Sequence, residues 1–323
     1  MVQAGTTMST VRKSAPLLLQ RLQRGLSTPP VELIYIPHSR WPLPHSQIIQ
    51  QHPNRPLRIS ILDSSFNPPT LAHLALANSP RPSCRDDGER DSELQDTCEY
   101  DAKLLLLSVK NADKLLKAGD TTYQQRLEMM LLLSEDVIAN TNTNASHSLL
   151  EHEPANVAIA ITDKPTFVGK SSALLDFLQR RLTIPLSIEL TFLVGLDTLE
   201  RLFSPRYYTS ETDMMASLRQ FLSAAPQGDN SRIVCAKRVA EAAQSIENVE
   251  DLLSLALAKE FRESDRIVII DIGNTVNSFS SSAIRSAIGR FGLGQGIDQD
   301  GGWKSKVTRD IANYIIEQRL YVD

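Results

Sequence analysis

The chain has 323 residues, of which 41% are hydrophobic and 22% are charged, so it can bury a substantial core in one large or two small domains. Its formal net charge of −4 argues against broad binding to a nucleic-acid backbone, and we expect a small ligand and no nucleic acid. No apolar run approaches the roughly 20 residues that cross a bilayer, and the three cysteines lack disulfide or zinc-site spacing, which predicts no membrane span and a reducing compartment.

The N-terminal segment is basic and ends in a Pro-rich stretch near Pro56. Its first thirty residues hold no acid, and Leu18, Leu22 and Leu26 recur at helical spacing. Two interpretations stay open: a mitochondrial presequence, or a helix that packs its leucine face on the domain. We expect residues 1–56 to form an N-terminal helix and Pro-rich extension, and a cytoplasmic or nuclear protein, with the mitochondrion as the alternative.

From Arg58 onward, short apolar runs alternate with helical patterns, which is typical of βαβ units. Right-handed crossovers would then place helices on both faces of one parallel sheet. The sequence therefore predicts an α/β fold, a doubly wound parallel sheet of the Rossmann-like kind. The expected strands are Ile59–Leu62, Leu104–Leu107, Val157–Ile161, Leu190–Val194, Ile233–Ala236 and Ile267–Ile270.

The intervening helical patterns cover Thr122–Ile138, Ser171–Leu182 and Val249–Phe261. Two polar stretches, near 79–99 and 141–154, interrupt the order and are expected to be surface loops or disorder. Because neither has the character of a domain boundary, residues 57–323 are expected to form one domain with two insertions. These insertions could dock other proteins, and a homo-oligomer is left open.

The loop after the first predicted strand is a candidate ligand site, because open parallel sheets bind ligands beyond the carboxyl ends of their strands. Ser64 and Ser65 permit a tight turn, and two prolines lead into a helix that Thr70 can cap. His73 follows one turn later. A helix amino end attracts phosphate, and a histidine there can donate hydrogen bonds to it. The residues alone leave an ordinary helix start equally open.

A second candidate helix start, Ser280-Ser281-Ser282-Ala283-Ile284-Arg285, follows the last predicted strand. Its hydroxyl groups can cap exposed N–H groups and present further donors. Arg285, one turn into the helix, can direct its planar charged group at a triphosphate. Two such helix starts in one α/β domain favour a nucleotide site.

These two segments resemble motifs of one known family. Ser65-Phe66-Asn67-Pro68-Pro69-Thr70-x-x-His73 resembles the GSFNPPTxxH signature of the nicotinamide mononucleotide adenylyltransferases, which belong to the (H/T)xxH nucleotidylyltransferase superfamily, and Ser280–Arg285 resembles their ISSTxIR motif. Weaker similarities are Lys114 after the second strand, Gly195-x-Asp197 as GxDxL, and a closing helix that ends in Leu320-Tyr321. The resemblance extends from Arg58 to the end of the chain.

The resemblance implies an enzyme of NAD biosynthesis that makes NAD and pyrophosphate from ATP and nicotinamide mononucleotide. The acceptor's 5′-phosphate would attack the α-phosphorus in line, so catalysis would consist of positioning and charge neutralisation. Mg²⁺ would enter with ATP and need no protein carboxylate cage. The implied catalytic residues are His73, Lys114 and Arg285. The implied ATP- and phosphate-binding residues are Ser64, Ser65, Phe66, Thr70, His73, Ser281, Ser282 and Arg285. The implied substrate-binding residues are Asn67, Phe167, Gly195 and Asp197.

The chain departs from the family pattern at three places. Ser64 replaces a glycine and Ser282 a threonine, both small changes. Thr162–Phe167 replaces an SxWE segment whose tryptophan stacks on the nicotinamide ring, and only Phe167 offers a ring face there, unless it packs in the core. Together with the start Asp63-Ser64-Ser65, this segment resembles a divergent fungal branch of the family. It leaves two alternatives open: a nucleotidylyltransferase for another phosphorylated acceptor, or a relative that binds or hydrolyses ATP with a regulatory role.

Overall fold

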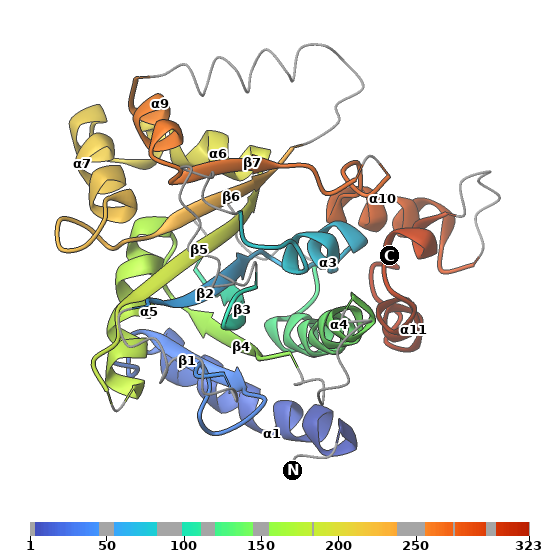
Figure 1. The fold of residues 1–323 in the computed structure, drawn as a ribbon. Helices are drawn as coiled ribbons and strands as arrows, with labels where there is room; N and C mark the ends of the chain where they lie inside the picture. The colour runs from blue at the N-terminus through green and yellow to red at the C-terminus, as the bar shows by residue number, and fades with distance from the viewer. Residues whose placement is uncertain are drawn as a thin grey trace.

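A seven-stranded sheet forms the centre of the computed structural model, which describes residues 4–44, 55–82, 99–110, 120–144, 155–182, 184–237, 256–273, 275–294 and 302–322 (Figure 1). The strands are β1 (Val31–Tyr35), β2 (Leu57–Asp63), β3 (Ala102–Ser108), β4 (Val157–Thr162), β5 (Ile188–Gly195), β6 (Arg232–Ala236) and β7 (Ile267–Ile270). Strands β2 to β7 pair in parallel, and β1 pairs antiparallel with β4 at one edge. Every strand expected from the sequence is present.

The strand order is β1-β4-β3-β2-β5-β6-β7. From β2 the chain builds outward through β3 and β4, and it then returns to the other side of β2 to add β5, β6 and β7. This is the order of the Rossmann fold, and it confirms the predicted doubly wound α/β class. The direction of building reverses between β2 and β5, so the carboxyl ends of these two strands form the topological switch point.

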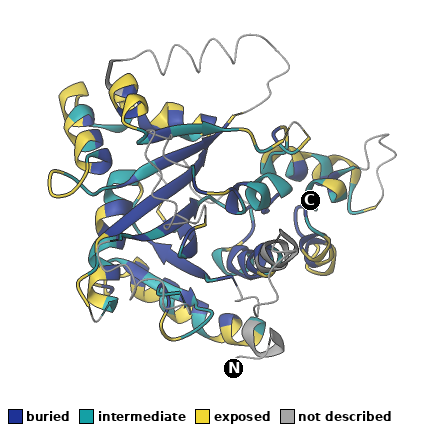
Figure 2. Cartoon of the chain, viewed as in Figure 1, coloured by how far each residue is buried: buried dark blue, intermediate teal, exposed yellow. Residues whose placement is uncertain are grey.

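Helices cover both faces of the sheet, and Figure 2 shows the strands buried between them. β3 and β4 are buried along almost their whole length, as expected for strands covered on both faces. One core lies under α1 (Ala4–Gln23), α3 (Leu71–Ala77), α4 (Tyr123–Asn144), α10 (Ser281–Phe291) and α11 (Arg309–Glu317). The other lies under α5 (Phe167–Arg181), α6 (Leu196–Leu202), α7 (Glu211–Leu222) and α9 (Ala256–Glu263). Short 3-10 helices span Pro205–Tyr207 and Trp303–Lys306.

The N-terminal helix is present, but it buries a different face from the one predicted. Val11, Ala15, Leu19 and Leu22 enter the core, whereas Leu26 lies beyond the helix and is 62% exposed. Strict four-residue spacing drifts around an α-helix, so the buried stripe shifts to include the three-residue step from Leu19 to Leu22.

The segment after this helix is more than a Pro-rich extension, because β1 adds an edge strand to the same sheet. Val31 pairs with Thr162, and a register shift follows between Leu33 and Tyr35. The helix is tied to the domain as well, since Arg12 pairs with Glu128 of α4 at 2.9 Å. Residues 4–44 therefore pack as part of the domain that was expected to begin at residue 57.

The remaining sequence expectations fall partly outside the described residues. The helix expected over Val249–Phe261 is described as α9 from Ala256, and residues 83–98 and 145–154, in the two predicted insertions, lie outside the described part. In the part that is described, no helix combines the length and apolar character that crossing a membrane requires.

Candidate active site

The switch point between β2 and β5 brings together two of the predicted site segments. β2 ends at Asp63 and continues into the loop Ser64–Thr70, while its parallel neighbour β5 ends at Gly195. Gly195 is exposed, its φ of −87° is open to any residue, and a Cβ built there meets no atom within 4 Å. The fold itself does not require glycine here, and the space beside it is open. Asp197 lies exposed in the first turn of α6.

The loop Ser64–Thr70 is anchored by Phe66, whose side chain is fully buried. Phe66 has a φ of +46°, a left-handed conformation that is rare for a bulky residue and typical of functional sites. Its ring lies 5.6 Å from that of His73, centroid to centroid. The whole residue is enclosed, and its predicted role in binding phosphate stays a prediction. Thr70, also buried, caps α3 as predicted.

The His73 ring is held by hydrogen bonds at both nitrogens. The Thr70 backbone N–H donates to Nδ1 at 3.0 Å, and Nε2 lies 2.9 Å from the Ser64 hydroxyl oxygen. Since Nδ1 accepts, the neutral ring carries its proton on Nε2 and donates it toward Ser64. Burial lowers the pKa of His73 from 6.5 to about 4, although the residue keeps intermediate exposure. At pH 7 His73 therefore presents an oriented, uncharged N–H donor.

The amino end of α10 contacts this same loop directly. Ser280 caps the helix by accepting from the Ala283 N–H at 3.1 Å, which leaves the next two hydroxyls for other contacts. Ser281 donates to the carbonyl oxygen of Pro68 at 2.7 Å. Arg285 donates to the carbonyl oxygen of Asn67 at 2.6 Å and, through its other terminal nitrogen, to Ser282 at 3.3 Å.

The two helix starts found in the sequence therefore converge on one loop. His73 lies just beyond its carboxyl end, and Arg285 bonds to its middle. Their separation in the chain exceeds two hundred residues, so only the fold brings them together. Donors from α3 and α10 thus lie at the edge of the sheet where an open α/β fold binds its ligand.

The Asn67 side chain is bound by protein groups that the sequence analysis did not predict. It is 4% exposed; its Oδ1 accepts hydrogen bonds from Thr121 and Tyr321, and its Nδ2 donates to Asp120. The predicted role of Asn67 in binding substrate stays a prediction. In the structure its side chain holds the loop to the start of α4 and to the end of the chain.

A buried ion pair lies under the switch point. Nζ of Lys170, in α5, is 2.5 Å from the Asp63 carboxylate, and both side chains are at most 7% exposed. The ammonium also lies 4.8 Å from the centre of the Phe167 ring. Phe167 in turn packs edge-on against Phe192 at 5.6 Å, so its ring is part of an aromatic contact in the core while the residue keeps intermediate exposure. Nothing in the local pattern of the sequence marked Lys170.

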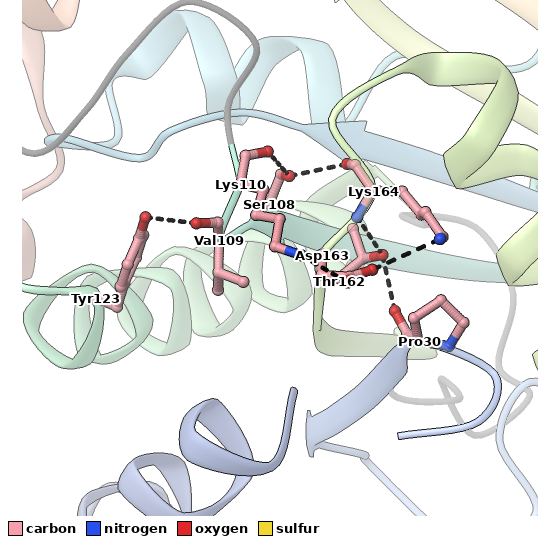
Figure 3. Close-up of polar contacts among 8 residues, drawn as sticks. All are labelled: Pro30, Ser108, Val109, Lys110, Tyr123, Thr162, Asp163 and Lys164. Atoms are coloured by element: carbon pink, nitrogen blue, oxygen red, sulfur yellow. Dashed lines mark hydrogen bonds and ion pairs between the residues drawn. The ribbon is translucent and has the colours of Figure 1, made fainter. Parts of the chain in front are cut away.

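The carboxyl ends of β3 and β4 carry a polar cluster, which includes part of the segment that lacks the family's tryptophan (Figure 3). The Ser108 hydroxyl oxygen lies 2.5 Å from the carbonyl oxygen of Lys110 and 2.9 Å from that of Lys164. The Asp163 carboxylate lies 3.2 Å from the Lys110 ammonium and 3.9 Å from that of Lys164. Lys114, predicted to contact phosphate, lies outside the described residues.

Among the described residues, no group of three His, Cys, Asp or Glu side chains could hold a metal ion. The expectation that Mg²⁺ arrives bound to ATP does not depend on such a group. The positively charged side chains described at this edge of the sheet include Arg285, Lys110 and Lys164.

Comparison with known proteins identifies the family. No protein-family model matches the chain. A Schizosaccharomyces pombe protein named "Putative nicotinamide mononucleotide adenylyltransferase" is 30% identical over 230 residues, which cover 71% of this chain and 75% of that protein. Two Plasmodium falciparum nicotinic acid mononucleotide adenylyltransferase structures, complexed with NaAD and with APC, align with TM-scores of 0.43 and 0.42 at 17% and 16% identity. These alignments cover 82% of this chain and 97% and 96% of those chains. On the length and identity of the S. pombe match, this chain belongs to the nicotinamide mononucleotide adenylyltransferase family of nucleotidylyltransferases.

Proposed function

We propose that the protein transfers the adenylyl group of ATP to nicotinamide mononucleotide, forming NAD and pyrophosphate. The observation that carries the proposal is the meeting of His73, Ser281 and Arg285 on the loop Ser64–Thr70 at the switch point. Family membership supports the reaction class, and the name of the S. pombe relative supports the acceptor.

In this reaction a 5′-phosphate oxygen of the acceptor forms a bond to the α-phosphorus of ATP. The bond from that phosphorus to the bridging oxygen breaks, and pyrophosphate leaves with the electron pair. The protein contributes no nucleophile. Both reactants are anionic, so the residues must bring them together and stabilise the charge that develops.

His73 is placed to donate its Nε2 proton to an oxygen of the α-phosphate, in exchange for its present contact with Ser64. Arg285 supplies a permanent positive charge. Ser282 supplies a hydroxyl donor for the departing pyrophosphate, and Ser281 supplies another in exchange for its present bond to the Pro68 carbonyl oxygen. Mg²⁺ on the ATP phosphates would reduce their charge. Lys114 is assigned to the phosphates by resemblance alone.

A second candidate function keeps the chemistry and changes the acceptor. The observation in its favour is the strand-end cluster, where Asp163 with two lysines occupies the segment in which the family carries its ring-stacking tryptophan. Phe167 supplies a ring at the end of this segment, but its edge-on contact with Phe192 ties it to the core. An acceptor without a pyridine ring, or one with a carboxylate on the ring, would suit such surroundings. The altered segment also keeps open the alternative of ATP hydrolysis with a regulatory role.

The test is to incubate the purified full-length chain with MgATP and nicotinamide mononucleotide, and to measure NAD and pyrophosphate. Equal amounts of both products are expected. Parallel reactions replace the acceptor with nicotinate mononucleotide or other phosphorylated compounds, and ATP with CTP. Pyrophosphate release only with another acceptor would select the second function. Release of inorganic phosphate from ATP without an acceptor-dependent product would rule out adenylyl transfer.

A further inference from the structure

Hydrogen bonds to one buried side-chain amide, that of Asn67, hold the loop Ser64–Thr70 in place. Oδ1 of Asn67 accepts from the Thr121 hydroxyl at 2.7 Å and from the Tyr321 hydroxyl at 2.8 Å. Its Nδ2 donates to the Asp120 carboxylate at 3.0 Å. Asn67, Thr121 and Tyr321 are each at most 9% exposed, so water does not readily replace the two bonds to the acceptor oxygen.

These partners come from distant parts of the chain. Thr121 lies just before α4, and Tyr321 follows α11 at the end of the chain. Tyr321 is itself held in the left-handed region with a φ of +65°, which a bulky residue adopts only when its surroundings impose it. The end of the chain is therefore placed specifically against the loop.

The backbone on either side of the held amide carries the contacts to α10. The carbonyl oxygen of Asn67 accepts from Arg285, and that of Pro68 accepts from Ser281. Because three hydrogen bonds hold the Asn67 side chain in place, they also restrain the backbone that carries both acceptors. The position of the Arg285 charge relative to His73 thus depends on how firmly Asn67 is held.

The electrostatic surroundings keep the Tyr321 hydroxyl in its donor form. Burial raises the pKa of Tyr321 above its ordinary value of 10, and the positive charges of Arg285 and Arg126 only partly oppose this. Arg126 in turn donates from Nε to the carbonyl oxygen of Thr121 at 3.1 Å. The donor to Asn67 is therefore protonated at any physiological pH.

We propose that Tyr321 and Thr121 are positioning residues for adenylyl transfer, which hold Asn67 and through it the loop that aligns Arg285 with His73. Neither residue is proposed to touch the nucleotide. The expected effect on kcat rests on the proposed function. The hydrogen bonds that hold the loop are present whether or not the protein catalyses this reaction.

The chain offers a matched control for Tyr321→Phe. Tyr314 is also buried, and its hydroxyl donates to the Glu128 carboxylate at 3.0 Å instead of to Asn67. Tyr314→Phe therefore loses a bond at least as strong. We expect Tyr321→Phe to lower kcat about five- to tenfold, the factor that one net hydrogen bond represents. Tyr314→Phe should keep kcat within about twofold despite an equal or greater loss of Tm.

Thr121→Val, which removes the second donor to the same oxygen, should lower kcat in the same direction as Tyr321→Phe. The double variant should lose less than the product of the two single effects, because both bonds restrain one group. Wild-type kcat in Tyr321→Phe, or equal losses in Tyr321→Phe and Tyr314→Phe, would overturn the inference.

Hydrogen–deuterium exchange without any substrate separates this inference from the proposed function. Amides of residues 64–73 should exchange about five- to tenfold faster in Tyr321→Phe than in wild type, and at the wild-type rate in Tyr314→Phe. If the wild-type chain makes no NAD, the proposed function fails while this measurement still decides the inference. Unchanged exchange of the loop in Tyr321→Phe would refute the inference even in an active enzyme.

Discussion

The carboxyl edge of the sheet has two sides that are built differently. The motif side comprises Ser64–His73 and Ser280–Arg285, and it is joined by short hydrogen bonds from the half-buried side chains of Ser281 and Arg285 to the buried loop at Pro68 and Asn67. The cluster side comprises Ser108–Lys110 and Thr162–Phe167, where the side chains of Lys110 and Lys164 are 60% and 42% exposed. Exposed ion pairs of this kind are weak and adjustable.

This difference suggests a division of tasks. Directional donors held in one geometry suit the stabilisation of a transition state, because they need no reorganisation when charge develops. Side chains that can move at little cost suit the selection of an acceptor, since they can be repositioned or replaced without loss of the fold. Substitutions on the motif side should therefore affect the rate of the chemical step, and those on the cluster side the choice of acceptor.

The largest effect is expected for His73→Ala on the motif side. Loss of an oriented N–H donor to the α-phosphate should lower kcat about 10²- to 10³-fold, the range found for single donors to a developing oxyanion. The KM for the acceptor should change much less. Initial rates of NAD formation measure both quantities. A variant with the kcat of the wild type would remove His73 from the mechanism.

The second prediction concerns the ion pair between Asp63 and Lys170. Asp63 ends β2, just before the motif side, and Lys170 lies in α5, which begins at the last residue of the cluster side. Asp63→Asn would leave the Lys170 ammonium buried without a carboxylate, and it should reduce the free energy of unfolding by about 3 kcal/mol. Urea denaturation followed by circular dichroism measures this. The double variant Asp63→Leu with Lys170→Met should recover most of the loss. If Asp63→Asn were as stable as wild type, the pair would not be the link between the two sides.

The sequence predicted the parts of the fold whose pattern is local. The six parallel strands were found because strands buried on both faces consist of nearly continuous apolar residues, as in Leu104–Leu107. β1 was missed because Val31–Tyr35 is short, carries Glu32, and has prolines on both sides, so it resembles the surrounding loop. An antiparallel edge strand also needs no crossover helix, so it lacks the alternation of strand and helix patterns from which the parallel strands were predicted.

The same limit applies to the site. Motif residues such as His73 and Arg285 were located because each lies at the start of a helix beside a strand end. The sequence analysis did not locate the groups that hold the site in place. Tyr321, Thr121 and Lys170 act through contacts between distant segments, which no local pattern indicates. Of the three serines that could cap α10, the structure uses Ser280, which leaves Ser281 to bond the loop.

The third prediction uses pH to test how tightly the motif side encloses His73. Burial lowers the pKa of His73 to about 4, against 6.5 without burial. Between these values the unfolded chain binds more protons than the folded one, so this contribution to stability is complete above pH 6.5 and is lost as the pH falls toward 4. Allowing for the intermediate exposure of His73, the loss is about 2 kcal/mol.

Urea denaturation of wild type and His73→Gln at pH values from 7 to 4.5 isolates this contribution. The difference in unfolding free energy between the two proteins should shift by about 2 kcal/mol in favour of the variant as the pH falls. Curves that stay parallel would mean that His73 titrates normally and is not enclosed by the motif side.

The smallest effect is expected on the cluster side. Asp163→Asn removes the carboxylate between Lys110 and Lys164 and leaves the cluster more positive. The ratio of kcat/KM for nicotinate mononucleotide over nicotinamide mononucleotide should rise about threefold, while the KM for ATP stays unchanged. Asp176→Asn is the matched control, because it removes an acid that pairs with Arg180 on the exposed surface of α5 and is not part of the cluster. An equal ratio in both variants would show that the cluster does not affect the choice of acceptor. A raised KM for ATP in Asp163→Asn would show that the cluster side also contributes to ATP binding, against the proposed division of tasks.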